Sequence, residues 1–160
     1  MRIAVLSDTH IPISADDLPQ AVYNGLMGVD MILHAGDLVE LDVLDKLAKI
    51  APVRAVCGNM DSDKVCAKLP KKDIIKIEAI SLGIMHGWGP PSDLVQLVSK
   101  EFKGVDVIVF GHSHNPLSQT EDGILFFNPG SPTDKVFAPY NSYGILEIKD
   151  KEIVPKIIKI

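Results

Sequence analysis

The sequence has no long apolar segment and no excess of basic residues. The first apolar run, residues 3–6, is followed at once by the polar pair Ser7–Asp8, so it is too short for the apolar region of a signal peptide. No other apolar run approaches the roughly 20 residues that cross a bilayer. The formal net charge of −5 argues against a dedicated nucleic-acid binder, which needs a basic surface. We therefore expect a cytoplasmic protein without membrane association.

Cysteine is also scarce. The only two, Cys57 and Cys66, are nine positions apart and form no C-x-x-C motif. Two thiols with this spacing on different elements make a poor metal-binding pair. We expect them to be the reduced thiols of an intracellular protein.

The first 60 residues repeat one pattern, a short apolar run followed by a polar motif and a helical stretch. Apolar runs at 3–6, 31–33 and 53–56 predict strands, and apolar residues at helical spacing predict helices over 18–27 and 39–50. Strands that alternate with helices favour a parallel sheet of βαβ units. In such sheets the functional residues gather at the carboxyl ends of the strands.

The remainder of the chain is richer in strands. A chain of 160 residues with 46% hydrophobic residues fits one domain with a single folded core. We expect an α/β fold over residues 1–160, a four-layer αββα sandwich of two packed mixed β-sheets flanked by helices, with Pro155 on an edge strand. The further elements predicted are a hairpin at 74–77 and 80–85, strands at 105–110, 125–128, 144–148 and 152–158, and helices at 63–69 and 92–102.

Polar side chains suited to metal binding follow five of the predicted strands. Imidazole and carboxylate groups together suit Mn²⁺, Fe²⁺, Zn²⁺, Co²⁺ or Ni²⁺. Each motif alone is weak, because an aspartate at a strand end more often caps a helix. Together they supply enough ligands for two divalent cations, which predicts a binuclear metallohydrolase. The seven candidates are Asp8, His10, Asp37, Asn59, His86, His112 and His114.

The ordered motifs D-x-H, G-D, G-N, H-G and G-H-x-H resemble those of the calcineurin-like metallophosphoesterase superfamily. The sequence is most similar to its small YfcE-like phosphodiesterase branch, along essentially the whole chain. This resemblance implies two divalent ions per chain, with Mn²⁺ as the first choice, and in-line attack on phosphorus by a hydroxide between them. It implies one ion held by Asp8, His10, Asp37 and His114, and another held by Asp37, Asn59, His86 and His112, with Asp37 bridging.

One position departs from the pattern of many family members, which carry a histidine directly after the motif asparagine. Here that position is Met60, which cannot donate a proton, so the general acid is unidentified. Asp61 could replace it, although an N-cap of the next helix is the simpler interpretation. His34 is expected to be packed rather than a ligand. Trp88 either walls the substrate pocket or only packs.

The resemblance implies a small phosphodiester substrate, and the sequence identifies no substrate-binding residues. The alternative function is a non-catalytic scaffold of the retromer-subunit type, whose metal site is degraded. The complete ligand set favours the enzyme. A metallo-β-lactamase would need an H-x-H-x-D-H string, which is absent. The apolar C-terminal strand, residues 153–160, could be covered by a second copy in a homo-oligomer.

Overall fold

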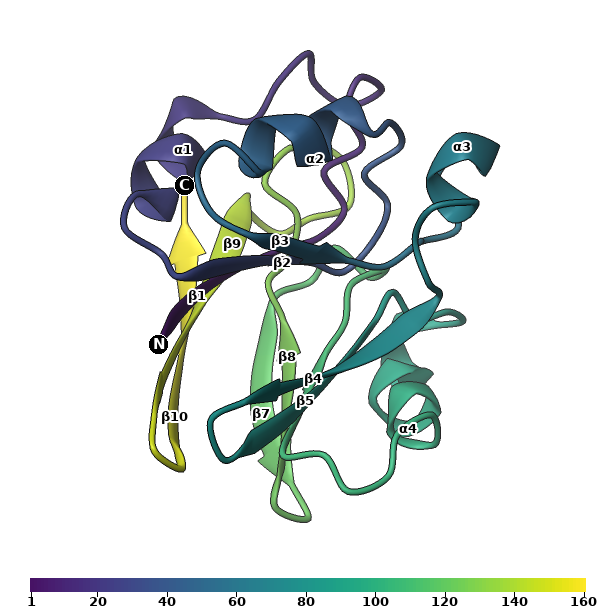
Figure 1. Ribbon diagram of the computed structural model, residues 1–160. Helices are drawn as coiled ribbons and strands as arrows, with labels where there is room; N and C mark the ends of the chain where they lie inside the picture. Colours follow the sequence, from purple (N-terminus) through teal and green to yellow (C-terminus); the bar gives the residue numbers. More distant parts are fainter.

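The computed structural model describes residues 1–160 as two five-stranded sheets that face each other, with helices on their outer sides (Figure 1). The first sheet has the order β10-β9-β1-β2-β3 and the second the order β4-β5-β6-β8-β7. The strands of the first sheet are β1 (Arg2–Leu6), β2 (Met31–His34), β3 (Val53–Ala55), β9 (Ser142–Lys149) and β10 (Glu152–Lys159). Those of the second are β4 (Lys72–Ile77), β5 (Ile80–Met85), β6 (Val107–Val109), β7 (Leu117–Glu121) and β8 (Ile124–Asn128).

Both sheets mix parallel and antiparallel pairs. β1, β2 and β3 run parallel to one another, while β9 pairs with β1 in the antiparallel sense. In the second sheet β5, β6 and β8 are parallel, and β4 and β7 pair antiparallel at the two edges. The carboxyl ends of the parallel strands therefore lie at one edge of each sheet, where α/β proteins place their functional residues.

The helices complete the four layers. α1 (Gln20–Leu26) and α2 (Asp42–Leu47) cover the first sheet, and α4 (Leu94–Ser99), preceded by a 3₁₀ turn at Pro91–Asp93, covers the second. α3 (Asp63–Cys66) lies in the connection between the sheets. One apolar cluster fills the space between the sheets, and two others join each sheet to its helices. The side chains of β1 alternate between the cluster that lies between the sheets and the cluster beneath the helices. Both faces of β1 are therefore buried, which is why its apolar run is continuous.

The predicted αββα sandwich is thus confirmed, as are the hairpin of β4 and β5 and the edge position of Pro155 in β10. The helices are shorter than predicted, because loop residues beside each helix also bury apolar side chains. None of the helices combines the length and the apolar composition that a membrane crossing requires. The cytoplasmic location and the homo-oligomer stay predictions.

The expectation of two reduced thiols is wrong, because Cys57 and Cys66 form a disulfide. Cys57 follows β3 and Cys66 ends α3, yet the chain reverses between them and brings their Cα atoms within 5.2 Å. That separation lies in the range a disulfide needs. Sequence spacing alone could not show this reversal.

Candidate metal centre

The candidate ligands lie in loops that leave the carboxyl ends of β1, β2, β3, β5 and β6. Five of the seven have a left-handed backbone, with φ between 43° and 70°: Asp8, His10, Asp37, His112 and His114. Such conformations are strained in non-glycine residues and persist at functional sites, where the surrounding structure enforces them. Most other non-glycine residues with positive φ in this chain lie in hairpin turns.

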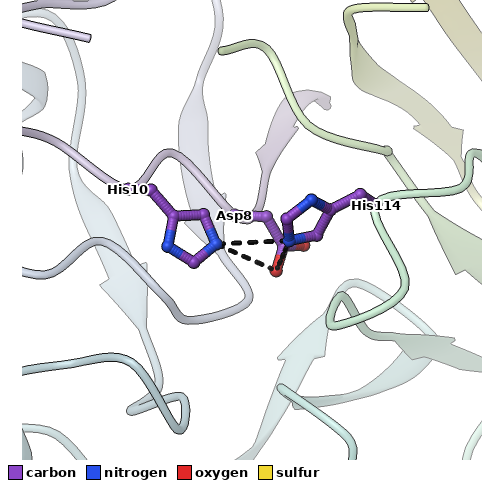
Figure 2. Close-up of side chains that lie close together, drawn as sticks. All are labelled: Asp8, His10 and His114. Atoms are coloured by element: carbon purple, nitrogen blue, oxygen red, sulfur yellow. Dashed lines mark hydrogen bonds and ion pairs between the residues drawn. The ribbon is translucent and has the colours of Figure 1, made fainter. Parts of the chain in front are cut away.

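Asp8, His10 and His114 form a first cluster, shown in Figure 2. His114 Nε2 lies 3.4 Å from Asp8 Oδ1, and His10 Nε2 lies 3.9 Å from the same oxygen. The two imidazole Nε2 atoms are 3.2 Å apart. Three ligand atoms from segments about 100 residues apart in sequence therefore converge on one point, as they would around a single cation.

Asp8, Asp37 and His86 form a second cluster that shares Asp8 with the first. His86 is 3% exposed, and its Nε2 lies 3.2 Å from Asp37 Oδ2 and 3.9 Å from Asp8 Oδ1. His86 Nδ1 donates to the carbonyl of Ala35 at 2.8 Å. Nε2 lies 3.2 Å from Asp37 Oδ2 but has no hydrogen-bond partner of good geometry. A buried nitrogen without a partner, facing two carboxylates, fits a metal ion.

Asn59 and His112 lie beside these clusters. Asn59 Oδ1 is 3.1 Å from His112 Nδ1, and His112 Nε2 is 3.1 Å from the carbonyl of Gly89. The backbone N–H of His112 donates to the carboxylate of Asp8. Both side chains line the same cleft of about 480 Å³ as His10, Asp37 and His114. The structure therefore brings five candidates into carboxylate–imidazole clusters and places the other two at the cleft wall.

The two clusters hold opposite charges in close contact. Burial alone would raise the pKa of Asp37, but His86 and the backbone N–H of Met60 outweigh it and lower that pKa. Burial alone would lower the pKa of His86, but the carboxylates of Asp37 and Asp8 raise it. Protons and cations therefore compete for the same carboxylate-facing nitrogen, so metal affinity should rise with pH.

Asp134 is a site residue that the sequence did not reveal. Its buried carboxylate accepts a hydrogen bond from His114 Nδ1 and further bonds from the backbone of residues 136–138. Burial alone would lower the pKa of His114, but Asp8 and Asp134 raise it to about 9. A carboxylate that is hydrogen-bonded to the ring nitrogen facing away from the metal fixes the tautomer and orientation of a ligating histidine. Asp134 therefore holds His114 with Nε2 directed at Asp8.

We predict that Asp134→Ala weakens divalent-cation binding about 10- to 100-fold, the usual effect of removing such a partner. Calorimetric titration of chelator-treated protein with Mn²⁺ measures it. The matched control is Asp45→Ala, which removes an exposed carboxylate on α2, away from the clusters. Unchanged Mn²⁺ affinity in Asp134→Ala would show that His114 needs no such support.

Asp61 does not cap α3, so that interpretation is wrong. The N-cap of α3 is Ser62, without a side-chain cap. The Asp61 carboxylate instead accepts hydrogen bonds from the backbone N–H groups of Asp37, Val39 and Gly58, at 3.1, 2.6 and 2.7 Å. It ties the loop after β2 to the loop after β3. The two loops that carry Asp37 and Asn59 are thereby held together.

The loop at 128–131 plays a similar part. Asn128 Nδ2 donates to the carbonyl of Gly111 at 2.8 Å, and Ser131 Oγ donates to the carbonyl of Asp8 at 2.7 Å. Both side chains are fully buried. This loop therefore fixes the backbone at Asp8 and at Gly111, the residue before His112.

His34 is packed, as predicted, with its side chain fully buried. Its Nδ1 accepts a hydrogen bond from the backbone N–H of Gly36, and its Nε2 lies 3.0 Å from Thr9 Oγ1. Nε2 therefore carries the proton and donates to Thr9. Burial is the main cause that lowers the pKa of His34 to about 4.

This shift predicts a pH-dependent stability of the metal-free protein. The unfolded state binds a proton on His34 near pH 6.5 and the folded state only near pH 4, so stability falls as pH falls through that window. The raised pKa values of His86 and His114 stabilise the folded state by an amount that stays constant below pH 6.5. The lowered pKa of Asp37 changes the stability only below about pH 4. Urea unfolding at pH 6 and pH 4.5 should show the loss, and His34→Gln should reduce it. Equal stability at both pH values in the unsubstituted protein would contradict this assignment.

The chain is similar to known phosphoesterases along most of its length. A model of the calcineurin-like phosphoesterase superfamily domain matches residues 1–151. A probable metallophosphoesterase of Methanocaldococcus jannaschii is 41% identical over 155 residues, which cover 94% of this chain and 78% of the relative. A phosphodiesterase of the same organism is 28% identical over 170 residues, covering 95% and 96%. The crystal structure of Vps29 complexed with Zn²⁺ from Entamoeba histolytica superposes with a TM-score of 0.80 at 27% identity, covering 100% of this chain and 98% of that one.

The parallel strands of the two sheets deliver clustered carboxylates and imidazoles to one end of the sandwich. This arrangement is that of a metal-dependent hydrolase. The chain belongs to the calcineurin-like phosphoesterase superfamily. The family predicted from the five motifs is thereby confirmed, and so is the prediction of a phosphoesterase enzyme.

Proposed function

We propose that the protein is a binuclear metal phosphodiesterase acting on small phosphodiesters. The observation that carries the proposal is the buried, unpartnered Nε2 of His86 between the carboxylates of Asp8 and Asp37. Asp8 belongs to both clusters, and Asp37 Oδ2 lies 3.2 Å from His86 Nε2 and 3.6 Å from His10 Nε2, which supports two neighbouring ions that share a carboxylate. The similarity to a protein named phosphodiesterase supports the choice of diesters.

The two cations would share Asp37 and take their other ligands from different residues. Two divalent cations, when bound, would supply a nucleophilic hydroxide and neutralise the charge that develops on the phosphoryl oxygens. The protein itself contributes rigid placement, because Asp61, Asp134 and the loop at 128–131 fix the ligands and their loops. One ion would be held by Asp8, His10, Asp37 and His114, and the other by Asp37, Asn59, His86 and His112.

The direct test is hydrolysis of bis(p-nitrophenyl) phosphate by metal-stripped protein, with Mn²⁺, Ni²⁺, Zn²⁺, Co²⁺ and Fe²⁺ added back singly. We expect activity only with added metal, Mn²⁺ being the first choice, and its loss in His86→Ala. A higher rate with this diester than with p-nitrophenyl phosphate identifies a diesterase. No turnover with any metal, despite two bound ions, would refute the proposal.

Met60 leads to a prediction about the leaving group. Met60 is 51% exposed at the cleft that the candidate ligands line, and its thioether has no proton to give. Without a general acid, the rate should depend steeply on the pKa of the leaving alcohol, so nitrophenyl esters should be cleaved far faster than alkyl esters. A series of aryl and alkyl methyl phosphates measures the slope. A rate independent of leaving-group pKa would reveal a general acid.

The second candidate function is a non-catalytic scaffold, favoured by the similarity to Vps29 over the whole chain. A scaffold does not need its metal ligands to be complete, whereas all seven are present here. The two functions differ in one result: a scaffold would bind ions without metal-dependent turnover.

A further inference from the structure

A second cavity, of about 690 Å³, adjoins the candidate metal centre. Its wall includes Asn59 and His86 from the centre, together with Lys71, Lys72 and Trp88. We propose that this cavity, here called the Trp88 pocket, binds the nucleoside part of a phosphodiester that carries a further negative charge. The inference rests on the proposed function, since it specifies the substrate of the same site.

The position of the pocket follows from the residues it shares with the cleft. Asn59 lines both the cleft of about 480 Å³ and the Trp88 pocket, so the two cavities are immediate neighbours. A phosphate held at the carboxylate–imidazole clusters can therefore direct one ester substituent into each cavity. The volume of the Trp88 pocket is within the range of small-molecule sites and suffices for a nucleoside.

Trp88 gives the pocket an aromatic surface. It is the only tryptophan of the chain and is 43% exposed. Gly87 and Gly89 on either side have φ of +95° and +84°, and a side chain at Gly87 would come within 3.0 Å of Leu94. The turn therefore packs closely through its glycines while the indole lines the pocket. Indole faces stack on heteroaromatic bases without needing a particular base.

The lysines give the pocket a positive charge. Lys72 is paired with Glu101 at 2.7 Å, whereas Lys71 forms no salt bridge. Two lysines against one glutamate leave one positive charge uncompensated, in a chain whose formal net charge is −5. A lining of this sign raises the local concentration of anions. Lys71 therefore favours a ligand with a second phosphate in addition to the one at the clusters.

Trp88 and Lys71 together favour some phosphodiesters over others. A glycerol or other alkyl diester has no ring to place against Trp88, and a cyclic mononucleotide has no second phosphate for Lys71. A linear dinucleotide with a terminal phosphate has both. The substrate class inferred is therefore a short, linear nucleotide diester with a free terminal phosphate.

Binding can be tested without turnover by titrating the full chain, as purified and after chelator treatment, with AMP, adenosine and ribose 5-phosphate. AMP should quench the fluorescence of Trp88 and bind at least about tenfold more tightly than either fragment. By calorimetry, Trp88→Ala should lose about tenfold in AMP affinity, and Trp88→Phe should lose less. Lys71→Gln should weaken AMP binding but not adenosine binding, while Lys68→Gln, in the same basic stretch but outside the pocket, should change neither.

Ribose 5-phosphate binding as tightly as AMP, or Trp88→Ala with unchanged AMP affinity, would overturn the inference. Turnover separates its failure from that of the proposed function. With Mn²⁺, Trp88→Ala should raise the KM of the p-nitrophenyl ester of thymidine 5′-phosphate about tenfold and leave that of methyl p-nitrophenyl phosphate unchanged. An equal effect on both esters contradicts the pocket alone. No cleavage of either ester by the unsubstituted protein contradicts the proposed function, whatever the quenching result.

Discussion

Replacing Asp37 by asparagine is expected to lower metal-dependent diester hydrolysis at least about a thousandfold. The Asp37 carboxylate lies 3.2 Å from His86 Nε2 and 3.6 Å from His10 Nε2, so it faces both clusters. An amide keeps the size and one oxygen of the carboxylate but loses the charge that would join two cations. Stabilisation by metal ions amounts to several kcal/mol in the transition state, and about 4 kcal/mol corresponds to the stated factor.

The measurement compares kcat/KM for bis(p-nitrophenyl) phosphate in Asp37→Asn and in Asp45→Asn, which changes an exposed carboxylate on α2. Thermal unfolding of both variants shows whether they are folded. We expect a folded, inactive Asp37→Asn and an active Asp45→Asn. A folded Asp37→Asn that retains more than about a tenth of the activity would mean that this carboxylate does not join the ions.

Asp61→Ala is expected to have the largest effect on stability, about 3 kcal/mol. Its carboxylate accepts three backbone N–H groups from the loops after β2 and β3, and alanine leaves all three without that acceptor. Each donor that loses a charged acceptor in a half-buried place costs on the order of 1 kcal/mol or more. Because these loops carry Asp37 and Asn59, metal affinity should fall as well.

Urea unfolding measures the stability, and calorimetric titration with Mn²⁺ measures the affinity. Asp63→Ala, two residues later on the exposed side of α3, is the control and should cost only a few tenths of a kcal/mol, the usual worth of an acidic residue in the first turn. Asp61→Asn, which keeps one acceptor oxygen, should lie between the two. Equal stabilities of Asp61→Ala and Asp63→Ala would show that the three hydrogen bonds contribute nothing.

The strand-end residues could be predicted from sequence because their signal is local. A continuous apolar run marks a strand buried on both faces, and a ligand-type residue directly after it must lie at the carboxyl edge. Asp8 after β1 and His86 after β5 are of this kind. Some paired strands, such as β4 and β5, are neighbours in sequence, and others, such as β1 and β9, are distant; the alternating first half and the strand-rich second half were enough to predict two mixed sheets.

What the sequence did not reveal depends on contacts between distant or irregular segments. Asp134 follows the Pro129–Gly130 turn with no periodic pattern around it, so nothing pointed to its contact with His114, 20 residues away. β7 is a polar edge strand, Leu117–Glu121, whose sequence has no apolar alternation. The Cys57–Cys66 disulfide requires a chain reversal that only the folded loop shows.

The central claim, that two cations bind at the two clusters, is tested most directly by anomalous X-ray diffraction from crystals of the Mn²⁺-loaded protein. The account predicts two anomalous peaks per chain on either side of the Asp8 and Asp37 carboxylates, one within ligand distance of His10 and His114 and the other of His86. A single peak, or peaks away from Asp37, would contradict the binuclear centre.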